Sequence, residues 1–310
     1  MKRKFKTLFT LGLALSILIT GCKNAETSVK ADTLNIVATT TMLADLSKII
    51  GGAHVTVNGL MGPGIDPHLY QASAGDVTLM QNADVVVYNG LHLEGKMGEI
   101  FESLTDRGST IICIENGLEK DKLLSWESDT SIHDPHIWFD VSLWKDAART
   151  VSNQLSEADP EHSEDYTNNL EKYLVELDDL DTYIKDRVSE LPEEQRVLIT
   201  AHDAFNYFGR AYGLEVRGLQ GISTDAEAGT ADVSNLSDFI TERKIKAIFI
   251  ESSVPPKTIE ALQAAVKARG FDVSIGGELY SDSLGGEGSG AETYLLTVKS
   301  NIDTIVEALK

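Results

Sequence analysis

Cysteine is scarce in this chain of 310 residues, which holds only Cys22 and Cys113. Cys22 directly follows an N-terminal segment that looks like a leader, so Cys113 is the one cysteine that remains after it and an intramolecular disulfide is excluded. Cys113 lies in the apolar stretch "TIICIE". This setting indicates a thiol buried in a strand rather than a reactive cysteine.

Basic residues are also few. The chain has 27 Lys and Arg against 48 Asp and Glu, and its formal charge is −21. Such a surface repels nucleic acid and anionic substrates and mildly concentrates cations. We therefore expect no nucleic-acid partner.

The common motifs of hydrolytic enzymes are missing. The sequence contains no His-Glu-x-x-His, no Gly-x-Ser-x-Gly and no phosphate-cradling glycine loop. The stretch "GGEGSG" at 285–290 is glycine-rich, but it is typical of a loop before the last helix. The sequence thus favours a binding protein over an enzyme.

The apolar run near the N-terminus covers only Leu8 to Ile19, which is too short to span a bilayer comfortably. It follows a basic head (Lys2, Arg3, Lys4, Lys6), and the pattern predicts a signal peptide over 1–21. The end of this segment, "ITGC", resembles the bacterial lipobox, which implies lipidation of Cys22. Plain secretion with an incidental Cys22 is the alternative. Residues 22–33 are polar and aperiodic and would form a lipidated tether, so we expect an extracytoplasmic protein that is lipid-anchored to the bacterial cell membrane.

Short apolar strands alternate with helical patterns along the remaining chain. The strands are "LNIVATT", "VTVNGL", "DVVVYNG" and "TIICIE", then "RVLITAH", "LEVRGL", "KAIFIESS" and "FDVSIGGELY"; helices are predicted to begin near residues 41, 74, 94, 203, 232, 256 and 291. Apolar strands separated by helices predict parallel sheets covered on both faces. We expect an α/β protein with two lobes, over 34–158 and 192–310.

A different segment separates the two lobes. From 159 to 191 apolar residues recur at steps of three and four, which predicts one amphipathic helix. Asp159 can cap it, Pro160 suits its first turn and Pro192 would end it. At 1.5 Å per residue this linking helix would be roughly 45–50 Å long. Two shorter helices with a kink are the alternative.

Two Asp-Pro-His tripeptides carry the first candidate ligands, His68 in "IDPHLY" and His136 in "HDPHIWFD". Each proline keeps its neighbours out of helix, so each imidazole lies on a loop. His202 ends the strand "RVLITAH", and Asp282 follows "SIGGELYS". Ligands of open α/β sheets bind beyond the carboxyl ends of strands, so these four side chains can converge on one cleft. Three imidazoles and one carboxylate suit a divalent transition metal, although any one histidine taken alone is more often structural.

Longer segments extend this pattern: "GIDPHLYQAS", "DPHIWFDV", "TAHDAFNYFGRAYGLEVRGLQGIST", "AIFIESSVPPK" and "IGGELYSDSLG". They resemble the signature segments of the TroA-like metal-receptor lipoproteins of manganese, zinc and iron ABC importers, and the resemblance runs from about Leu34 to the C-terminus. It implies two α/β lobes joined by a long backbone helix, with one metal at the lobe interface. The four ligand positions of the family correspond here to His68, His136, His202 and Asp282.

The resemblance also implies the partners of the protein. One Mn²⁺ or Zn²⁺ per chain would be bound as cargo and passed to the membrane permease of an ABC transporter, and we expect a monomer. The segment "AHDAF" has His202 where the manganese branch usually has Glu, and the stretch 116–131 lacks the His-rich loop of the zinc branch. Manganese is favoured as the transported ion. A zinc- or iron-specific receptor of the same importer type, or a surface adhesin with the same fold, are the alternatives.

Further polar residues are candidates for contacts around the site. Glu251, at the end of "AIFIE", points to the same cleft, and each ligand histidine has an adjacent or nearby aspartate (Asp66, Asp134, Asp203) that could orient its ring. Solvated turn carboxylates are the alternative for each aspartate. Of the other histidines, we expect His54 and His162 at the surface. His92 and His133 are weaker candidates for positions near the metal or its entry path.

Overall fold

The computed structural model describes residues 33–310 apart from 127 and 128, and the chain from Asp32 to Lys310 forms one compact unit. The predicted signal peptide (1–21) and the lipidation site at Cys22 lie outside the described residues. Within the described part, no helix is long and apolar enough to cross a membrane.

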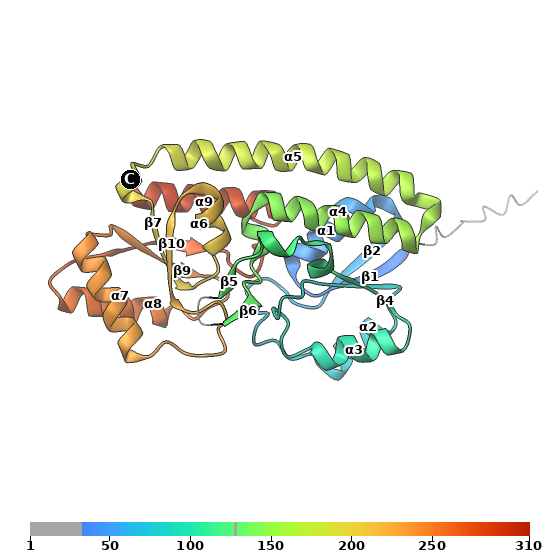
Figure 1. The fold of residues 1–310 in the computed structure, drawn as a ribbon, viewed down its shortest axis with the longest axis horizontal. Coiled ribbons are helices and arrows are strands. Elements are labelled where there is room, and N and C mark those ends of the chain that lie inside the picture. Colours follow the sequence, from blue (N-terminus) through green and yellow to red (C-terminus); the bar gives the residue numbers. More distant parts are fainter. Residues whose placement is uncertain (1–32, 127–128) are drawn as a thin grey trace, which may run out of the picture. The chain divides into compact units, whose positions relative to one another are not determined.

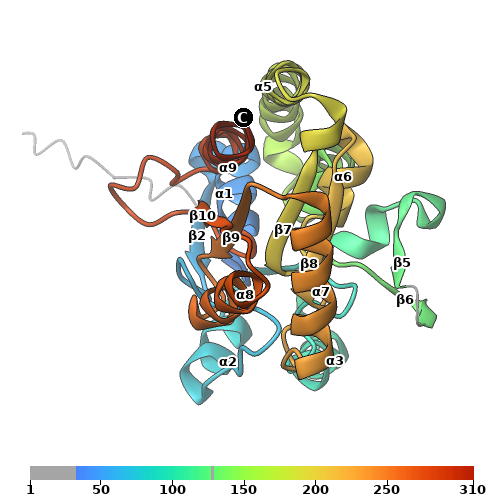
Figure 2. The ribbon, with the colours of Figure 1, turned by 90° about the vertical axis from the view of Figure 1, so that its left-hand side faces the viewer.

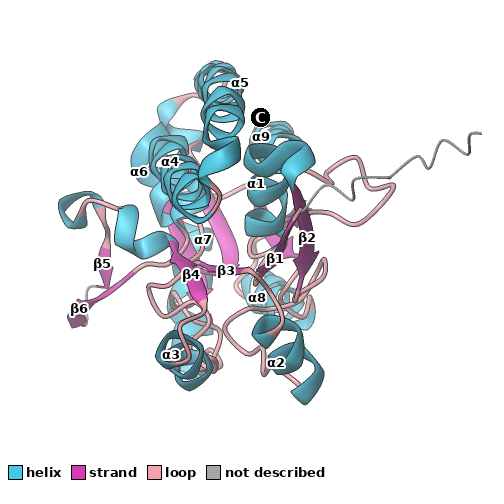
Figure 3. Cartoon of the chain, turned by 90° about the vertical axis from the view of Figure 1, so that its right-hand side faces the viewer, coloured by secondary structure: helices cyan, strands magenta, loops and turns pink. Residues whose placement is uncertain are grey.

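The first lobe is built on a four-stranded parallel sheet in the order β2–β1–β3–β4. Its strands are β1 (Leu34–Ala38), β2 (Val55–Gly59), β3 (Val85–Tyr88) and β4 (Thr110–Cys113), and its helices are α1 (Thr41–Gly51), α2 (Ala74–Gln81), α3 (Gly98–Asp106) and α4 (Val141–Ala158). Figure 3 shows α1 and α4 on one face of the sheet and α2 and α3 on the other. Both faces are therefore buried, as the unbroken apolar strands predict: Ile36 and Ala38 face one core, and Val37 faces the other.

The second lobe repeats the design. Its strands are β7 (Val197–His202), β8 (Glu215–Gln220), β9 (Ala247–Glu251) and β10 (Ser274–Leu279), and its helices are α6 (Asn206–Tyr212), α7 (Thr230–Arg243), α8 (Lys257–Ala268) and α9 (Tyr294–Leu309). Strands β7 and β8 pair in parallel, as do β9 and β10, and β7 lies against β9 (Figure 2). The predicted α/β class with two parallel-sheet lobes is confirmed.

Helix α5 (Ser163–Ser189) runs between the lobes in sequence as one uninterrupted element of 27 residues. It packs on α1 and α4 of the first lobe and on α9 of the second (Figure 1). Its start differs from the prediction, because residues 160–162 form a separate 3-10 turn. The Asp159 carboxylate does not cap the helix but accepts hydrogen bonds from His162 Nδ1 and Tyr166 Oη, each at 2.7 Å.

Two further local details differ from the sequence prediction. The helix expected near Glu94 begins at Gly98, because Leu91 and His92 adopt left-handed backbone conformations and the Glu94 carboxylate accepts the backbone N–H of Asn89 at 2.9 Å. Between β4 and α4, where the sequence looks irregular, a short antiparallel hairpin joins β5 (Ser125–Trp126) and β6 (Asp129–His133).

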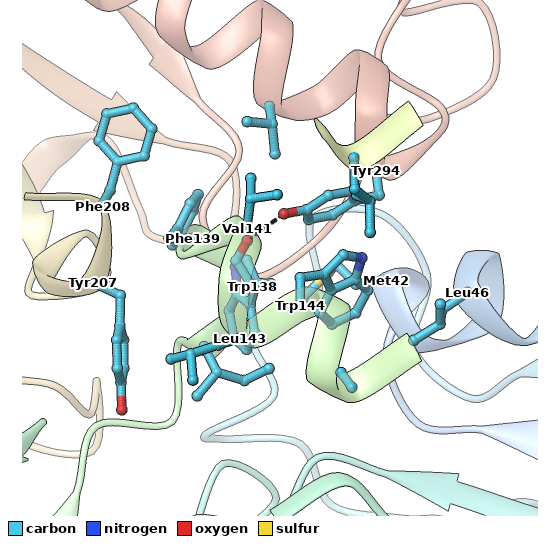
Figure 4. Packing of buried hydrophobic residues seen from close by; sticks show 14 of the residues in the cluster. Met42, Leu46, Trp138, Phe139, Val141, Leu143, Trp144, Tyr207, Phe208 and Tyr294 are labelled. Carbon is cyan, nitrogen blue, oxygen red and sulfur yellow. Dashed lines mark hydrogen bonds between the residues drawn. The ribbon is translucent and has the colours of Figure 1, made fainter. Parts of the chain in front are cut away.

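Aromatic residues tie the two lobes together beside the predicted site (Figure 4). Trp138 of the first lobe donates from Nε1 to the carbonyl of Ser281 at 2.9 Å, and Tyr294 of the second lobe donates its hydroxyl to the carbonyl of Trp138 at 2.7 Å. The Tyr294 ring also stacks on Trp144, with the ring centroids 4.8 Å apart. These groups are buried, so the lobes share one packed core at this point.

Candidate metal centre

Both Asp-Pro-His tripeptides use the same local device. The backbone N–H of His68 donates to Asp66 Oδ1 at 2.9 Å, and the backbone N–H of His136 donates to Asp134 Oδ1 at 2.9 Å. Because the intervening proline has no N–H, each aspartate side chain binds the N–H two residues on and closes a tight turn. The repeat thus presents each histidine on a rigid loop.

The second lobe supplies its two side chains from strand ends. His202 is the last residue of β7, and its backbone N–H donates to Oε1 of Glu251, the last residue of β9, at 2.9 Å. Asp282 follows the end of β10 at Leu279. Parallel strands bring their carboxyl ends to one edge of the sheet, which is why these residues meet.

The four predicted ligands lie together at the junction of the two lobes. Their ligand atoms are all within 4.8 Å of one another. His136 Nε2 lies 3.3 Å from Nε2 of both His68 and His202. Each oxygen of the Asp282 carboxylate lies near one ring: Oδ1 is 3.5 Å from His136 Nε2 and Oδ2 is 3.4 Å from His202 Nε2. Donors around a four-coordinate ion at about 2.0–2.1 Å lie about 3.3–3.4 Å apart, so the nearest spacings in this cluster fit a single metal ion.

The cluster is shielded from water. His68 is 3 % exposed, His136 and His202 are 0 % exposed, and Asp282 is 1 % exposed. Among the described residues, Asp282 Oδ1 accepts no hydrogen bond, while Oδ2 accepts one from Ser253 Oγ at 3.0 Å. A buried carboxylate oxygen without a partner is costly unless something else binds it. The group of three histidines and one aspartate is therefore suited to hold one metal ion.

Two carboxylates orient the imidazole rings from behind. Asp134 Oδ1 lies 2.7 Å from His136 Nδ1, and Glu251 Oε2 lies 2.6 Å from His202 Nδ1. The second contact is at ion-pair distance rather than a well-aligned hydrogen bond. Each contact occupies Nδ1, so Nε2 is the atom that each ring presents to the cluster.

The other residues that the sequence suggested for contacts around the site make different contacts. Asp66 accepts the backbone N–H of His68 and the hydroxyl of Thr224 but does not hydrogen-bond to the His68 ring, and Asp203 Oδ1 accepts the backbone N–H of Gly218. His92 is exposed, and His133 Nδ1 lies 3.4 Å from Ser125 Oγ.

His54 and His162 are partly exposed and lie apart from the cluster. His54 Nε2 is 2.9 Å from Asp165 Oδ2, and the two histidine rings stack with centroids 3.9 Å apart.

Ser253 contacts the cluster through Asp282, but the sequence did not indicate it as a site residue. Its only signal in the sequence is its position two residues after Glu251.

The charges within the cluster shift its pKa values strongly. Burial lowers the pKa of His68 to about 3. Burial also disfavours the charged form of His136, but the carboxylates of Asp134 and Asp282 outweigh it and raise the pKa of His136 to about 8. For His202, Glu251 and Asp282 likewise outweigh burial and raise the pKa well above its usual range. The same two histidines hold the pKa of Asp282 well below its usual range, although burial opposes this.

A two-lobed α/β fold with a buried group of three imidazoles and one carboxylate defines a metal-binding protein. Residues 36–308 match the family ZnuA, described as "Zinc-uptake complex component A periplasmic", and the chain belongs to this family. The resemblance seen in the sequence is thereby confirmed.

Individual relatives cover nearly the whole chain. The chain is 50% identical over 275 residues to "Zinc-binding protein TroA" of Treponema pallidum, with 88% of each chain covered. It is 44% identical over 299 residues to "Manganese-binding lipoprotein MntA" of Bacillus subtilis, with 96% of this chain and 97% of the relative covered. The solved structure of periplasmic zinc-binding TroA from Treponema pallidum superposes with a TM-score of 0.86 at 49% identity, covering 89% of this chain and 99% of that one.

Metal affinity should fall as the pH drops below about 8. In the metal-free protein His136, with its pKa raised to about 8, carries a proton at lower pH. Coordination requires neutral imidazole, so the metal must displace that proton. Below the pKa, affinity should fall about tenfold per pH unit for each proton displaced. Competitive titration between about pH 6 and pH 9, corrected for protonation of the competing chelator, measures this slope; a flat profile over that range would contradict it.

Proposed function

We propose that this protein is an extracytoplasmic solute-binding receptor that captures one divalent transition metal and delivers it to the membrane permease of an ABC transporter. The ligands in this proposal are His68, His136, His202 and Asp282. The observation that carries it is the convergence of these four buried side chains, two from each lobe, within 4.8 Å. The family description and the printed names of the relatives, which are metal-binding proteins, support the same function.

Capture rather than catalysis fits the donor set. A catalytic metal site keeps a coordination position open for water or substrate and places a general base beside it. Here four side chains supply the donors, and all four are buried. The two nearby carboxylates, Asp134 and Glu251, face the ring nitrogens on the far side from the cluster. We therefore propose a receptor and not an enzyme.

We favour manganese as the transported ion, with zinc also bound. Asp282 places each of its oxygens within 3.5 Å of a ligand nitrogen. Both oxygens can therefore reach one ion, and five donors suit Mn²⁺ better than tetrahedral Zn²⁺. Intrinsic affinity still favours zinc, so selection of manganese would depend on coordination geometry and on which ion is available.

We further propose the boundaries and the anchor of the mature protein. The metal-binding lobes would span 34–158 and 192–310 and be joined by 159–191, within which α5 contacts helices of both. Residues 1–21 would be removed, and the lipid on Cys22 would hold the protein to the membrane as a monomer through the tether 22–33. The printed name of the Bacillus subtilis relative, a lipoprotein, supports the anchor.

Removing a ligand should abolish tight binding without unfolding the protein. His68→Ala or Asp282→Asn should weaken affinity by more than about a hundredfold, because loss of even an outer partner of a ligand costs 10–100-fold. Competitive titration with Mn²⁺ and Zn²⁺ measures the effect, and thermal unfolding of the metal-free variants checks the fold. His92→Ala is the matched control, since His92 is exposed and outside the cluster, and its affinity should not change. Unchanged affinity in the ligand variants would refute the ligand assignment.

Replacing the proposed lipidation site should free the protein from the membrane. A Cys22→Ser chain has no thiol to carry the lipid, so the covalent anchor that would hold the body of the protein at the membrane is lost. Fractionation of cells expressing each form measures the distribution between membrane and soluble fractions. If the variant remains in the membrane fraction like the wild type, Cys22 is not the anchor.

A further inference from the structure

The loop that carries His68 belongs to the first lobe but is held by the second. The backbone N–H of Gly64 donates to the Ser283 hydroxyl at 2.8 Å, next to the ligand Asp282. The Thr224 hydroxyl donates to Asp66 Oδ2 at 2.6 Å. These two contacts hold the loop at Gly64 and Asp66, shortly before its ligand, so separation of the lobes would break them and part His68 from the two ligands of the second lobe, His202 and Asp282.

Asp66 connects the second lobe directly to the ligand. Its Oδ1 accepts the backbone N–H of His68, and its Oδ2 accepts the hydroxyl of Thr224. Thr224 is only 8 % exposed, so its hydrogen bond to a carboxylate is largely shielded from water. A hydrogen bond to a charged group contributes more than a neutral one, particularly where water is excluded.

The loop at 221–229 that carries Thr224 has its own supports. Gln220, at the end of β8, donates from Nε2 to the carbonyl of Ala226 at 3.1 Å and so holds the loop to its own lobe. Asp225 also reaches the first lobe, with Oδ1 2.9 Å from Lys96 Nζ, but these side chains are 49% and 41% exposed. An exposed ion pair of this kind contributes little to stability. The Thr224–Asp66 hydrogen bond is therefore the stronger of the two contacts that this loop makes across the lobes.

We propose that Thr224 and Asp66 form a latch that keeps His68 in its metal-binding position and thereby sets the rate at which the bound metal leaves. This inference rests on the proposed receptor function. Thr224 is a positioning residue in it, since it touches no ligand atom of the cluster and acts only through Asp66. Release to a permease would then require this hydrogen bond to break before His68 can withdraw.

The test is the rate of Mn²⁺ release from the full-length mature chain into excess chelator, followed by stopped flow. Thr224→Val keeps the size of the side chain but removes the hydroxyl. It should speed release about tenfold or more, the effect expected for a lost hydrogen bond to a charged group. The association rate should change little, so the equilibrium affinity should weaken by a similar factor.

Two further variants separate the hydrogen bond from general damage. Thr224→Ser restores the hydroxyl and should restore the wild-type release rate. Ser223→Ala is the matched control, because the Ser223 hydroxyl bonds only to Asp225 within the same loop, and its release rate should not change. A wild-type rate in Thr224→Val would overturn the latch, as would a Thr224→Ser variant that releases metal as fast as the valine variant.

Folding and the receptor function are checked separately. If thermal unfolding shows that Thr224→Val does not fold, Ser283→Ala removes the second tether of the His68 loop and should also speed release. An unchanged rate in that variant would count equally against the latch. A wild-type protein that fails to bind Mn²⁺ or Zn²⁺ tightly would refute the proposed function instead.

Discussion

The centre of the molecule has to accommodate buried negative charge. Asp134, Glu251 and Asp282 are each at most 2 % exposed, and all three contact the buried imidazoles. Buried carboxylates are costly unless positive charge is close by. Protons on His136 and His202 supply it in the metal-free protein, as their raised pKa values indicate. A dication carries the charge of two protons, so metal can replace them with little change in the charge of the site.

Two kinds of local structure bring these groups together, one in each lobe. Strand ends position His202, Glu251 and Asp282, while the rigid Asp-Pro-His turns position the two ligands of the first lobe. Helix α5 packs on both lobes, and the buried contacts of Trp138 with Ser281 and Tyr294 join them. Four donors from two lobes can then meet within less than 5 Å, as the cluster requires. The hydrogen bond proposed as a latch, from Thr224 to Asp66, also crosses this junction.

Much of this could be predicted from the sequence because the decisive signals are local. Apolar strands that alternate with helices indicate the α/β class. Proline keeps His68 and His136 on loops, and His202 directly ends an apolar run that predicts a strand. The directions in which the side chains around the ligands point could not be predicted from such local signals. Asp66, Asp134 and Asp203 look alike beside their histidines, yet only Asp134 reaches a ring, because the direction of each side chain depends on distant partners such as Gly218 and Thr224. Ser253 was missed for that reason, and the late start of α3 follows from the hydrogen bonds of Glu94.

The most direct test of the account is to locate and identify the ion. Crystals of protein purified without added metal, measured on both sides of the manganese and zinc absorption edges, would give an anomalous difference peak for each element. The account predicts one peak per chain. The ion at this peak should be bound by Nε2 of His68, His136 and His202 and by both carboxylate oxygens of Asp282. An ion bound elsewhere, or these four side chains pointing apart around an empty centre after soaking with either metal, would contradict it.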